Sequence, residues 1–92
     1  MESLVFYPVN VSGSPHTGWW VTFPDLPGVM GSAGTQEEAM HRASAALYDC
    51  LEGLMDNKQP IPGPKRYTGL GVELDADFSA RVLQYIAGDV TT

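Results

Sequence analysis

The chain has 92 residues, of which 43% are hydrophobic and 17% are charged, and its formal net charge is −6. This length and hydrophobic content allow one small domain with a thin core, and the sparse charge argues against a disordered body. The acidic balance argues against nucleic-acid binding by the chain alone, because phosphate contacts need clustered Lys and Arg. A single cysteine, Cys50, excludes an intramolecular disulfide. Its place in a helical apolar pattern predicts a small core residue rather than a nucleophile.

No apolar run approaches the roughly 18 residues that a membrane-spanning helix needs. The acidic start, Met1-Glu2-Ser3, differs from the basic start of a signal peptide. We therefore expect a cytoplasmic protein without a membrane partner.

The first predicted strand covers residues 4–11, because its odd-numbered residues from Val5 to Val11 are hydrophobic and would share one face. Pro8 within this run indicates an edge position or a bulge. The polar segment 12–18 contains the residues of a hairpin loop. An antiparallel pair with the next strand is expected.

The second predicted strand covers residues 19–23, with Trp20 on the face that points away from the core. Leu4 and Phe6 lie on the corresponding outward face of the first strand. An apolar group of this kind on an acidic protein predicts a protein interface. The alternative is that the C-terminal helix packs over it.

A rigid turn follows the second strand. Pro24 and Pro27 fix their own φ angles and donate no hydrogen bond, so the strand must end before them. Asp25 is suited to bond nearby backbone, and Gly28 can adopt a positive φ. A glycine-rich third strand is predicted at 28–32.

The main helix is predicted from Thr35 to about Asp56. Thr35 and Glu38 form a capping box at its start, and Glu38 can pair with Arg42 one turn later. Gly53 costs about 1 kcal/mol relative to Ala inside a helix, which indicates a packing reason for it. The buried stripe is predicted to contain Ala39, Ala43, Ala46, Leu47, Cys50, Leu51 and Leu54.

A proline-rich linker is predicted at 57–67, with Lys65 and Arg66 as its only adjacent basic pair. A short fourth strand at 70–74 and a helix at 78–87 complete the segment 68–88. The helix would be capped by Asp75 or Asp77 and ended by Gly88. Because a strand joined through a helix most simply returns parallel in the same sheet, a parallel fourth strand is expected.

These elements predict an α+β fold with the order β-β-β-α-β and a short C-terminal helix. Three antiparallel strands and a fourth strand would pack against one main helix. The whole chain, 1–92, is predicted to be one domain whose core covers about 4–56.

The order of motifs resembles the N-terminal domain of HicB-type antitoxins. Singly each motif is weak, but together they are specific, and they cover about two thirds of the chain. The motifs are Tyr7-Pro8-Val9, Gly18-Trp19, Phe23-Pro24-Asp25-Leu26-Pro27-Gly28, Gly34-Thr35 with Glu38-Ala39, the helical residues Ala43, Leu47, Leu51 and Leu54, and Pro60-Ile61-Pro62-Gly63-Pro64.

The resemblance implies a partial RNase H-like fold and a partner. Members of the family pair with a small, basic HicA-type toxin, an RNA-cleaving protein, and neutralise it by covering its active surface. Many relatives also carry a C-terminal DNA-binding unit. Here about 28 residues follow the proline-rich linker, and residues 72–89 fit better as the closing strand and helix, so we expect no direct DNA binding.

An RNase H-like fold directs attention to carboxylates that could hold Mg²⁺. Glu73, Asp75 and Asp77 alternate along the chain, but the favoured interpretation is a solvated strand end followed by a helix cap. Asp25 between two prolines is interpreted as a turn residue rather than a metal ligand. His16 and His41 lack a sequence-adjacent partner that would tune a general base. No catalytic residue, cofactor or metal site is therefore predicted.

Three hypotheses remain at this stage. The favoured one is an antitoxin that forms a dimer or tetramer and masks a basic toxin without chemistry of its own. The second is a stand-alone oligomeric adaptor without a toxin. The third is a metal-dependent nuclease that uses Asp25 and the acids from Glu73 to Asp77.

Overall fold

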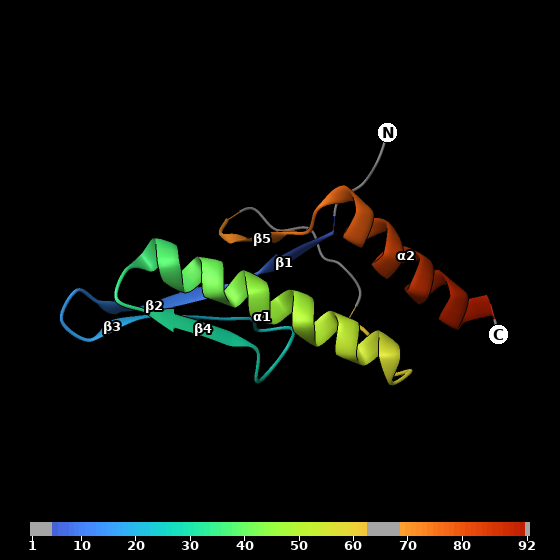
Figure 1. Ribbon diagram of the computed structural model, residues 1–92, viewed down its shortest axis with the longest axis horizontal. Coiled ribbons are helices and arrows are strands. Elements are labelled where there is room, and N and C mark those ends of the chain that lie inside the picture. Colours follow the sequence, from blue (N-terminus) through green and yellow to red (C-terminus); the bar gives the residue numbers. More distant parts are fainter. Residues whose placement is uncertain (1–4, 63–68, 92) are drawn as a thin grey trace.

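The computed structural model describes residues 5–62 and 69–91 and confirms the α+β class (Figure 1). Helix α1 lies across one side of the strands, and α2 lies at the opposite end from the β2–β3 hairpin. The elements in chain order are β1 Phe6–Pro8, β2 Asn10–Ser14, β3 Gly18–Thr22, β4 Met30–Ala33, α1 Gln36–Asp56, β5 Gly71–Glu73 and α2 Ala76–Thr91.

The first predicted strand forms as two strands rather than one. β1 pairs with β5, while β2 pairs with β3 in the three-stranded antiparallel sheet β2-β3-β4. If the register that joins Asn10 to Thr22 continued, Pro8 would lie opposite Pro24. Neither proline has an N–H to donate, so the ladder between β2 and β3 stops at this point.

The fourth strand does not return parallel as predicted. β5 pairs antiparallel with β1, with Tyr7 opposite Val72. The chain therefore enters the edge of β1 from the end opposite to the one that a parallel strand would use. The connection from Asn57 to Leu70 is long enough to do this, because an extended chain spans about 3.3 Å per residue.

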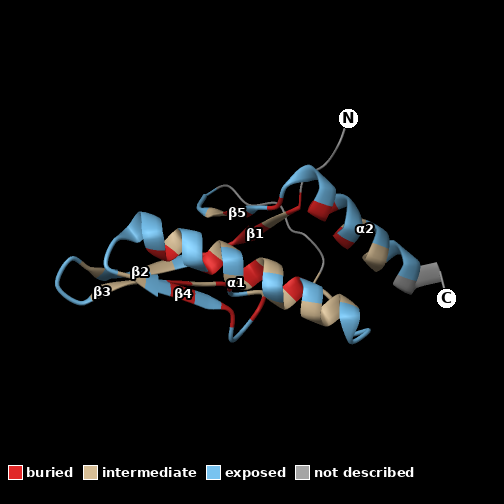
Figure 2. Ribbon diagram, in the orientation of Figure 1, coloured by how far each residue is buried: buried red, intermediate tan, exposed pale blue. Residues whose placement is uncertain are grey.

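The main helix begins and ends where its sequence predicts. The Thr35 side chain accepts a hydrogen bond from the Glu38 N–H at 3.2 Å, and Asn57 forms the C-terminal cap. The buried side of α1 faces the strands (Figure 2) and contains Ala39, Ala43, Leu47 and Leu51. The predicted reason for Gly53 is wrong, because a Cβ at this position would meet open space.

Small residues bring α1 close to β4. A Cβ built on Gly31 would lie 2.7 Å from the Ala39 carbonyl oxygen and would also collide with the backbone of Ala43. Ala39 and Ala43 are completely buried. The helix therefore packs on the strand backbone itself, which only glycine at position 31 allows.

The C-terminal helix is longer than predicted. Asp75 is its N-terminal cap, since its carboxylate accepts a hydrogen bond from the Phe78 N–H at 2.8 Å. The helix continues through Gly88 to Thr91, so Gly88 is not its end. A glycine raises the cost of a helix by about 1 kcal/mol but does not forbid it.

One core joins all of these elements. It combines Val5, which precedes β1, and Tyr7 of β1 with the inner stripe of α1 and with Phe78 and Val82 of α2. The Val5 N–H donates to the buried hydroxyl of Ser79 at 3.0 Å, which joins α2 to the start of β1. The closing strand and helix are therefore part of the same packed unit as the predicted core.

Candidate protein-interaction surface

The turn between β3 and β4 consists of two successive hydrogen-bonded turns. The Leu26 N–H donates to the Phe23 carbonyl, and the Val29 N–H donates to the Leu26 carbonyl, both at 3.1 Å. Pro24 and Pro27 each occupy the second position of a turn, where a fixed φ is favourable. Gly28 has φ 95°, as the third position of a type II turn requires. This turn buries Leu26 and Val29 and sets the start of β4.

The three-stranded sheet has one side covered by α1 and one side that no described element covers. Val21 and Gly31 are buried toward α1. The residues on either side of them in each strand point the other way, because side chains alternate along a strand. We call this second side the open sheet face; it consists of Asn10, Ser12, Trp20, Thr22, Met30 and Ser32.

Trp20 and Met30 form the apolar part of the open sheet face. Trp20 is 39% exposed and Met30 is 51% exposed. Trp20 lies opposite Ser32, and Met30 lies opposite Thr22, so the two side chains are diagonal neighbours. Side chains of this length reach each other across such a diagonal. The face carries no charged residue, although the chain as a whole is acidic.

The structure does not bring Phe6, another predicted interface residue, to Trp20. Leu4 lies outside the described residues. Phe6 is half-buried, and its ring covers Gly71 of β5, where a Cβ would lie 2.6 Å from a ring carbon. Ser12, which faces Trp20, is six residues from Phe6, or roughly 20 Å along a strand. The alternative that α2 covers Trp20 is wrong, because α2 packs beside Val5 and the C-terminal half of α1.

Met30 is a surface residue that the sequence interpretation missed. The predicted strand at 28–32 was assigned no exposed side. The neighbouring residue Val29 could have indicated this. Val29 is buried in the turn, and adjacent side chains of a strand point to opposite sides, so Met30 must face outward.

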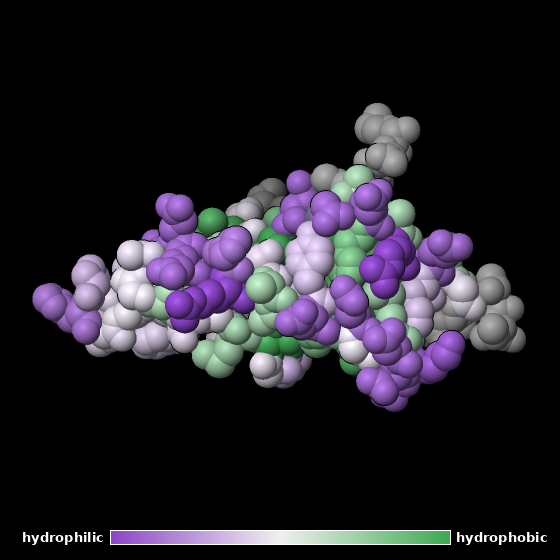
Figure 3. Space-filling model, viewed as in Figure 1, coloured by the Kyte–Doolittle hydropathy of each residue, from purple (hydrophilic) through white to green (hydrophobic). Residues whose placement is uncertain are grey.

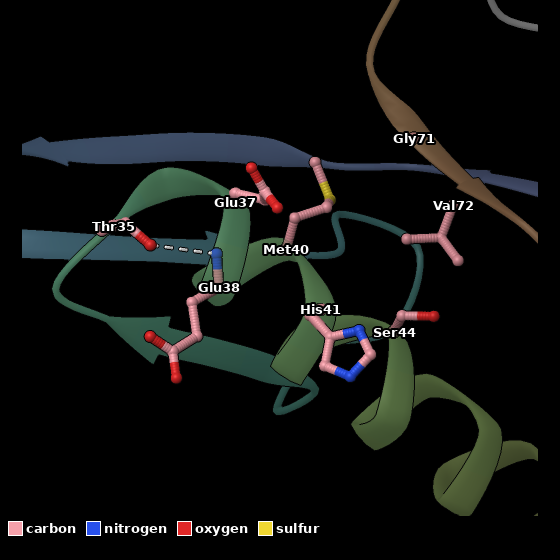
Figure 4. A pocket seen from close by; sticks show the side chains of 8 residues that line it. All are labelled: Thr35, Glu37, Glu38, Met40, His41, Ser44, Gly71 and Val72. Carbon is pink, nitrogen blue, oxygen red and sulfur yellow. Dashed lines mark hydrogen bonds between the residues drawn. The ribbon is translucent and has the colours of Figure 1, made fainter.

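A second surface feature is a groove between the first turns of α1 and the strand β5, with a volume of about 830 Å³ (Figure 4). We call it the α1–β5 groove. Met40 and Val72 supply apolar wall, and Glu37 and Glu38 supply acidic wall. Its lining also includes Thr35, His41, Ser44 and Gly71. No Lys or Arg is among these lining residues.

Of the acidic residues considered as metal ligands in the segment 73–77, Asp75 has a structural role. Asp75 caps α2 and also contacts Tyr48, whose hydroxyl lies 3.2 Å from one carboxylate oxygen and accepts from the Asp75 N–H at 2.9 Å. Asp77 lies in the first turn of α2, and Glu73 is exposed on β5. Within residues 5–62 and 69–91, no three His, Cys, Asp or Glu side chains come close enough together to hold a metal ion.

The remaining candidates are distributed over the surface and the core. His16 is exposed in the β2–β3 loop, and His41 is exposed on α1. Cys50 is half-buried and packs against the core. The basic pair Lys65 and Arg66 lies outside the described residues.

Tyr7 attaches the proline-rich linker to the core. Its ring is completely buried, and its hydroxyl donates to the Pro62 carbonyl at 2.9 Å. Burial, together with the nearby Asp25 and Cys50, raises the pKa of Tyr7 to about 12. The hydroxyl therefore stays protonated and keeps the linker beside β1 over the physiological pH range.

The side of the molecule that carries α1 is mainly hydrophilic at both ends of this helix, with hydrophobic residues gathered between α1 and α2 (Figure 3). An exposed ion pair joins Glu38 and Arg42 at 3.5 Å. Neither helix, as far as the chain is described, is long and apolar enough to cross a membrane.

Comparison with known proteins gives consistent matches. A family described as "HicB_like antitoxin of bacterial toxin-antitoxin system" matches residues 7–91. Antitoxin HicB 2 of Photorhabdus laumondii is 35% identical over 83 residues, which cover 90% of this chain and 59% of that protein. Antitoxin HicB of Escherichia coli is 28% identical over 79 residues, covering 84% of this chain and 57% of that protein.

The fold has a solved counterpart. The N-terminal domain of the antitoxin HicB from Burkholderia pseudomallei superposes with a TM-score of 0.57 and 20% identity, over 76% of this chain and 95% of that one. At this identity the likeness concerns the fold. The chain spans less than two thirds of the length of the curated relatives that it matches.

Proposed function

Because the chain belongs to the HicB-like antitoxin family of bacterial toxin–antitoxin systems, we propose that it binds and neutralises a small, basic HicA-type toxin that cleaves RNA. The family match over residues 7–91 is the observation that carries this proposal. The net charge of −6 supports it, because opposite charges accelerate association and exclude wrong partners. The site of action would be the cytoplasm.

Neutralisation would occur by steric masking, without catalysis by this chain. One of the carboxylates that the nuclease hypothesis needs has another role here, since Asp75 caps α2 and contacts Tyr48. The named relatives are antitoxins. We propose no catalytic residue, cofactor or direct DNA contact for these 92 residues.

Co-expression with the product of an adjacent small open reading frame tests the proposal. A tag on this chain should retain the basic protein in fixed stoichiometry through size exclusion. If both proteins are soluble and do not co-purify, the toxin-binding function is wrong and the adaptor hypothesis takes its place.

We further propose that the chain self-associates through the open sheet face. Two acidic copies repel each other at long range. The open sheet face carries no charged residue, so two copies can meet there without bringing like charges together. Trp20 would be its centre, since large aromatic residues dominate interface energies. Phe6 is less suited to this role because its ring already covers Gly71.

Light scattering after size exclusion tests this face. Trp20→Asp should convert an oligomer into a monomer, because a buried unpaired carboxylate opposes association. Leu70→Asp is the matched control: Leu70 is also a large exposed hydrophobic residue, at 58%, but it lies outside the open sheet face. Equal masses for the wild type and Trp20→Asp would exclude the proposed face.

A further inference from the structure

Strand β4 has β3 as its one neighbouring strand among the described residues. The Arg42 side chain donates from Nη1 to the Ser32 carbonyl at 3.3 Å, so this carbonyl points away from β3. Because backbone groups alternate in direction along a strand, the N–H of Ser32 and both backbone groups of Met30 also point away from β3. We call this side the outward edge of β4. Within residues 5–62 and 69–91, no bond outside the β3–β4 ladder engages the N–H of Met30 or of Ser32.

The described residues that flank the gaps in the chain lie beside β1, β5 and α2. Pro62 accepts a hydrogen bond from Tyr7 of β1, and Gly69 lies two residues before β5. Val5, the first described residue, donates to Ser79 of α2. Figure 1 shows β4 on the opposite side of the molecule from β5. The outward edge of β4 is therefore remote from each of these positions.

Arg42 gives the outward edge of β4 only weak protection. Charged residues and proline are the usual devices that block pairing at a sheet edge, and β4 itself contains neither. Arg42 bridges the Ser32 carbonyl and the Glu38 carboxylate, but the side chains of the ion pair are 61% and 56% exposed and lie 3.5 Å apart. An exposed pair of this kind contributes little. Arg42 can therefore move aside, or share the carbonyl, which has two lone pairs.

Helix α1 opposes the use of this edge by a second copy of the chain. A Cβ on Gly31 would lie 2.7 Å from the Ala39 carbonyl oxygen, so α1 lies directly over β4. Two-fold antiparallel pairing of β4 with its copy would place both α1 helices on one side of the joined sheet. They would lie over strands about 4.8 Å apart, whereas the axes of packed helices need about 8–10 Å. The edge is therefore open to a strand that carries no helix above it.

The charges beside the edge favour a basic occupant. The bond from Arg42 to Ser32 places this flank of α1 above the outward edge of β4. Glu38 lies one turn before Arg42 and Asp49 lies two turns after it, so both share the same flank, and both are exposed. An added strand that carries Lys or Arg could pair with these carboxylates, and the net charge of −6 would attract it over a longer range.

We propose that an extended basic segment of the partner toxin adds to the outward edge of β4 and lengthens the sheet β2-β3-β4 by one strand. The proposal rests on the toxin-binding function above and names the surface and the mode of recognition. The backbone groups of Met30 and Ser32 would bond to the main chain of the toxin and supply affinity. Glu38 and Asp49 would supply the preference for basic side chains and the speed of association.

A proline at position 32 tests the edge through one backbone N–H. Proline is tolerated in an edge strand where its missing N–H faces away from the sheet, so Ser32→Pro should fold, as circular dichroism verifies. Its affinity for the co-expressed basic protein should fall at least about tenfold, because the toxin loses a main-chain partner and meets the proline ring. Ser32→Ala is the matched control, since it removes the same hydroxyl and keeps the N–H. Equal affinities of the two variants would overturn the proposal and leave toxin binding intact.

Residue-resolved amide exchange by NMR tests the same edge in the unaltered chain. In the free chain the amides of Met30 and Ser32 should exchange rapidly, whereas those of Gly31 and Ala33, which are directed toward β3, should be protected. In the complex, exchange at Met30 and Ser32 should slow at least about tenfold, as expected for newly hydrogen-bonded amides. Rapid exchange at both residues in a stable complex would refute the added strand, even if Ser32→Pro failed to fold.

Removal of Arg42 separates a local effect from a general effect of charge. Arg42→Ala unblocks the edge and removes a cation that would repel the toxin, so binding should strengthen about threefold. Arg81→Ala changes the net charge equally, but Arg81 is exposed on α2 and packs over Phe78, so its effect should be smaller. Equal effects would overturn the proposed site. A lower solution mass of Ser32→Pro than of Ser32→Ala without toxin would assign the edge to a second copy and also overturn it. If no complex forms with any variant or with the wild type, the toxin-binding function itself is wrong.

Discussion

Gly31→Ala tests whether direct backbone packing between β4 and α1 holds the domain together. The added methyl group would lie 2.7 Å from the Ala39 carbonyl oxygen, whereas ordinary contact begins at 3.4 Å. Relief requires a shift of at least about 0.7 Å between strand and helix, because the Ala43 backbone nitrogen would lie closer still, and such a shift forfeits a quarter to a half of each affected dispersion contact. Since the opposing atoms belong to helix backbone rather than to a flexible side chain, we expect the free energy of unfolding to fall by about 2–3 kcal/mol.

The same substitution at Gly53 is the internal control. A methyl group at Gly53 meets no atom within 4 Å, so Ala should raise the free energy of unfolding by about 0.5–1 kcal/mol through helix propensity alone. Urea unfolding followed by circular dichroism measures both, with equal m-values as the check on a two-state comparison. The corresponding fall in Tm for Gly31→Ala is about 10–20 °C. A Gly31→Ala variant as stable as the wild type would refute the close packing.

Three further substitutions test local features by the same unfolding assay. Thr35→Ala removes the cap of α1 and should cost about 1 kcal/mol, unlike Thr35→Ser, which keeps the hydroxyl. Gly28→Ala places a side chain at φ 95° in open space, so its cost of about 1–2 kcal/mol is purely conformational; no loss of stability would contradict the type II turn. Tyr7→Phe loses the bond to Pro62 and should cost about 1 kcal/mol at neutral pH.

The raised pKa of Tyr7 also predicts a pH dependence with a definite sign. The unfolded chain ionises this tyrosine near pH 10, and the folded protein does so only near pH 12. The contribution is therefore complete below pH 10 and is lost as the pH rises toward 12, at about 1.4 kcal/mol per pH unit. Wild-type stability should fall more steeply than that of Tyr7→Phe across this interval; parallel slopes would contradict the assignment.

The sequence predicted those elements that local chemistry determines. Thr35, Glu38 and the apolar stripe of α1 specify a capped amphipathic helix by short-range interactions, and its bounds agree with the structure. The double turn after β3 was similarly foreseeable, since Pro24, Pro27 and Gly28 restrict the backbone directly.

The failures concern long-range pairing. The direction of β5 depends on how far the connection after Asn57 travels, which no local pattern encodes. The division of the first strand depends on Pro8 and Pro24 lying opposite each other, and this requires the register of the hairpin. The end of α2 was misplaced for a different, local reason. Glycine disfavours a helix only weakly, and the favourable interactions of the other helical residues carry α2 past Gly88.

The candidate surface was predicted only in part. Trp20 follows from alternation within one strand, but its neighbour Met30 requires the β3–β4 register. The α1–β5 groove joins residues that are about thirty positions apart, so composition and periodicity could not reveal it.

The most direct test of the central claim is a growth-rescue assay in bacteria that carry the adjacent small open reading frame under an inducible promoter. Induction alone should arrest growth, and co-expression of this chain should restore it. Growth arrest that persists despite abundant, soluble wild-type chain would contradict the antitoxin function.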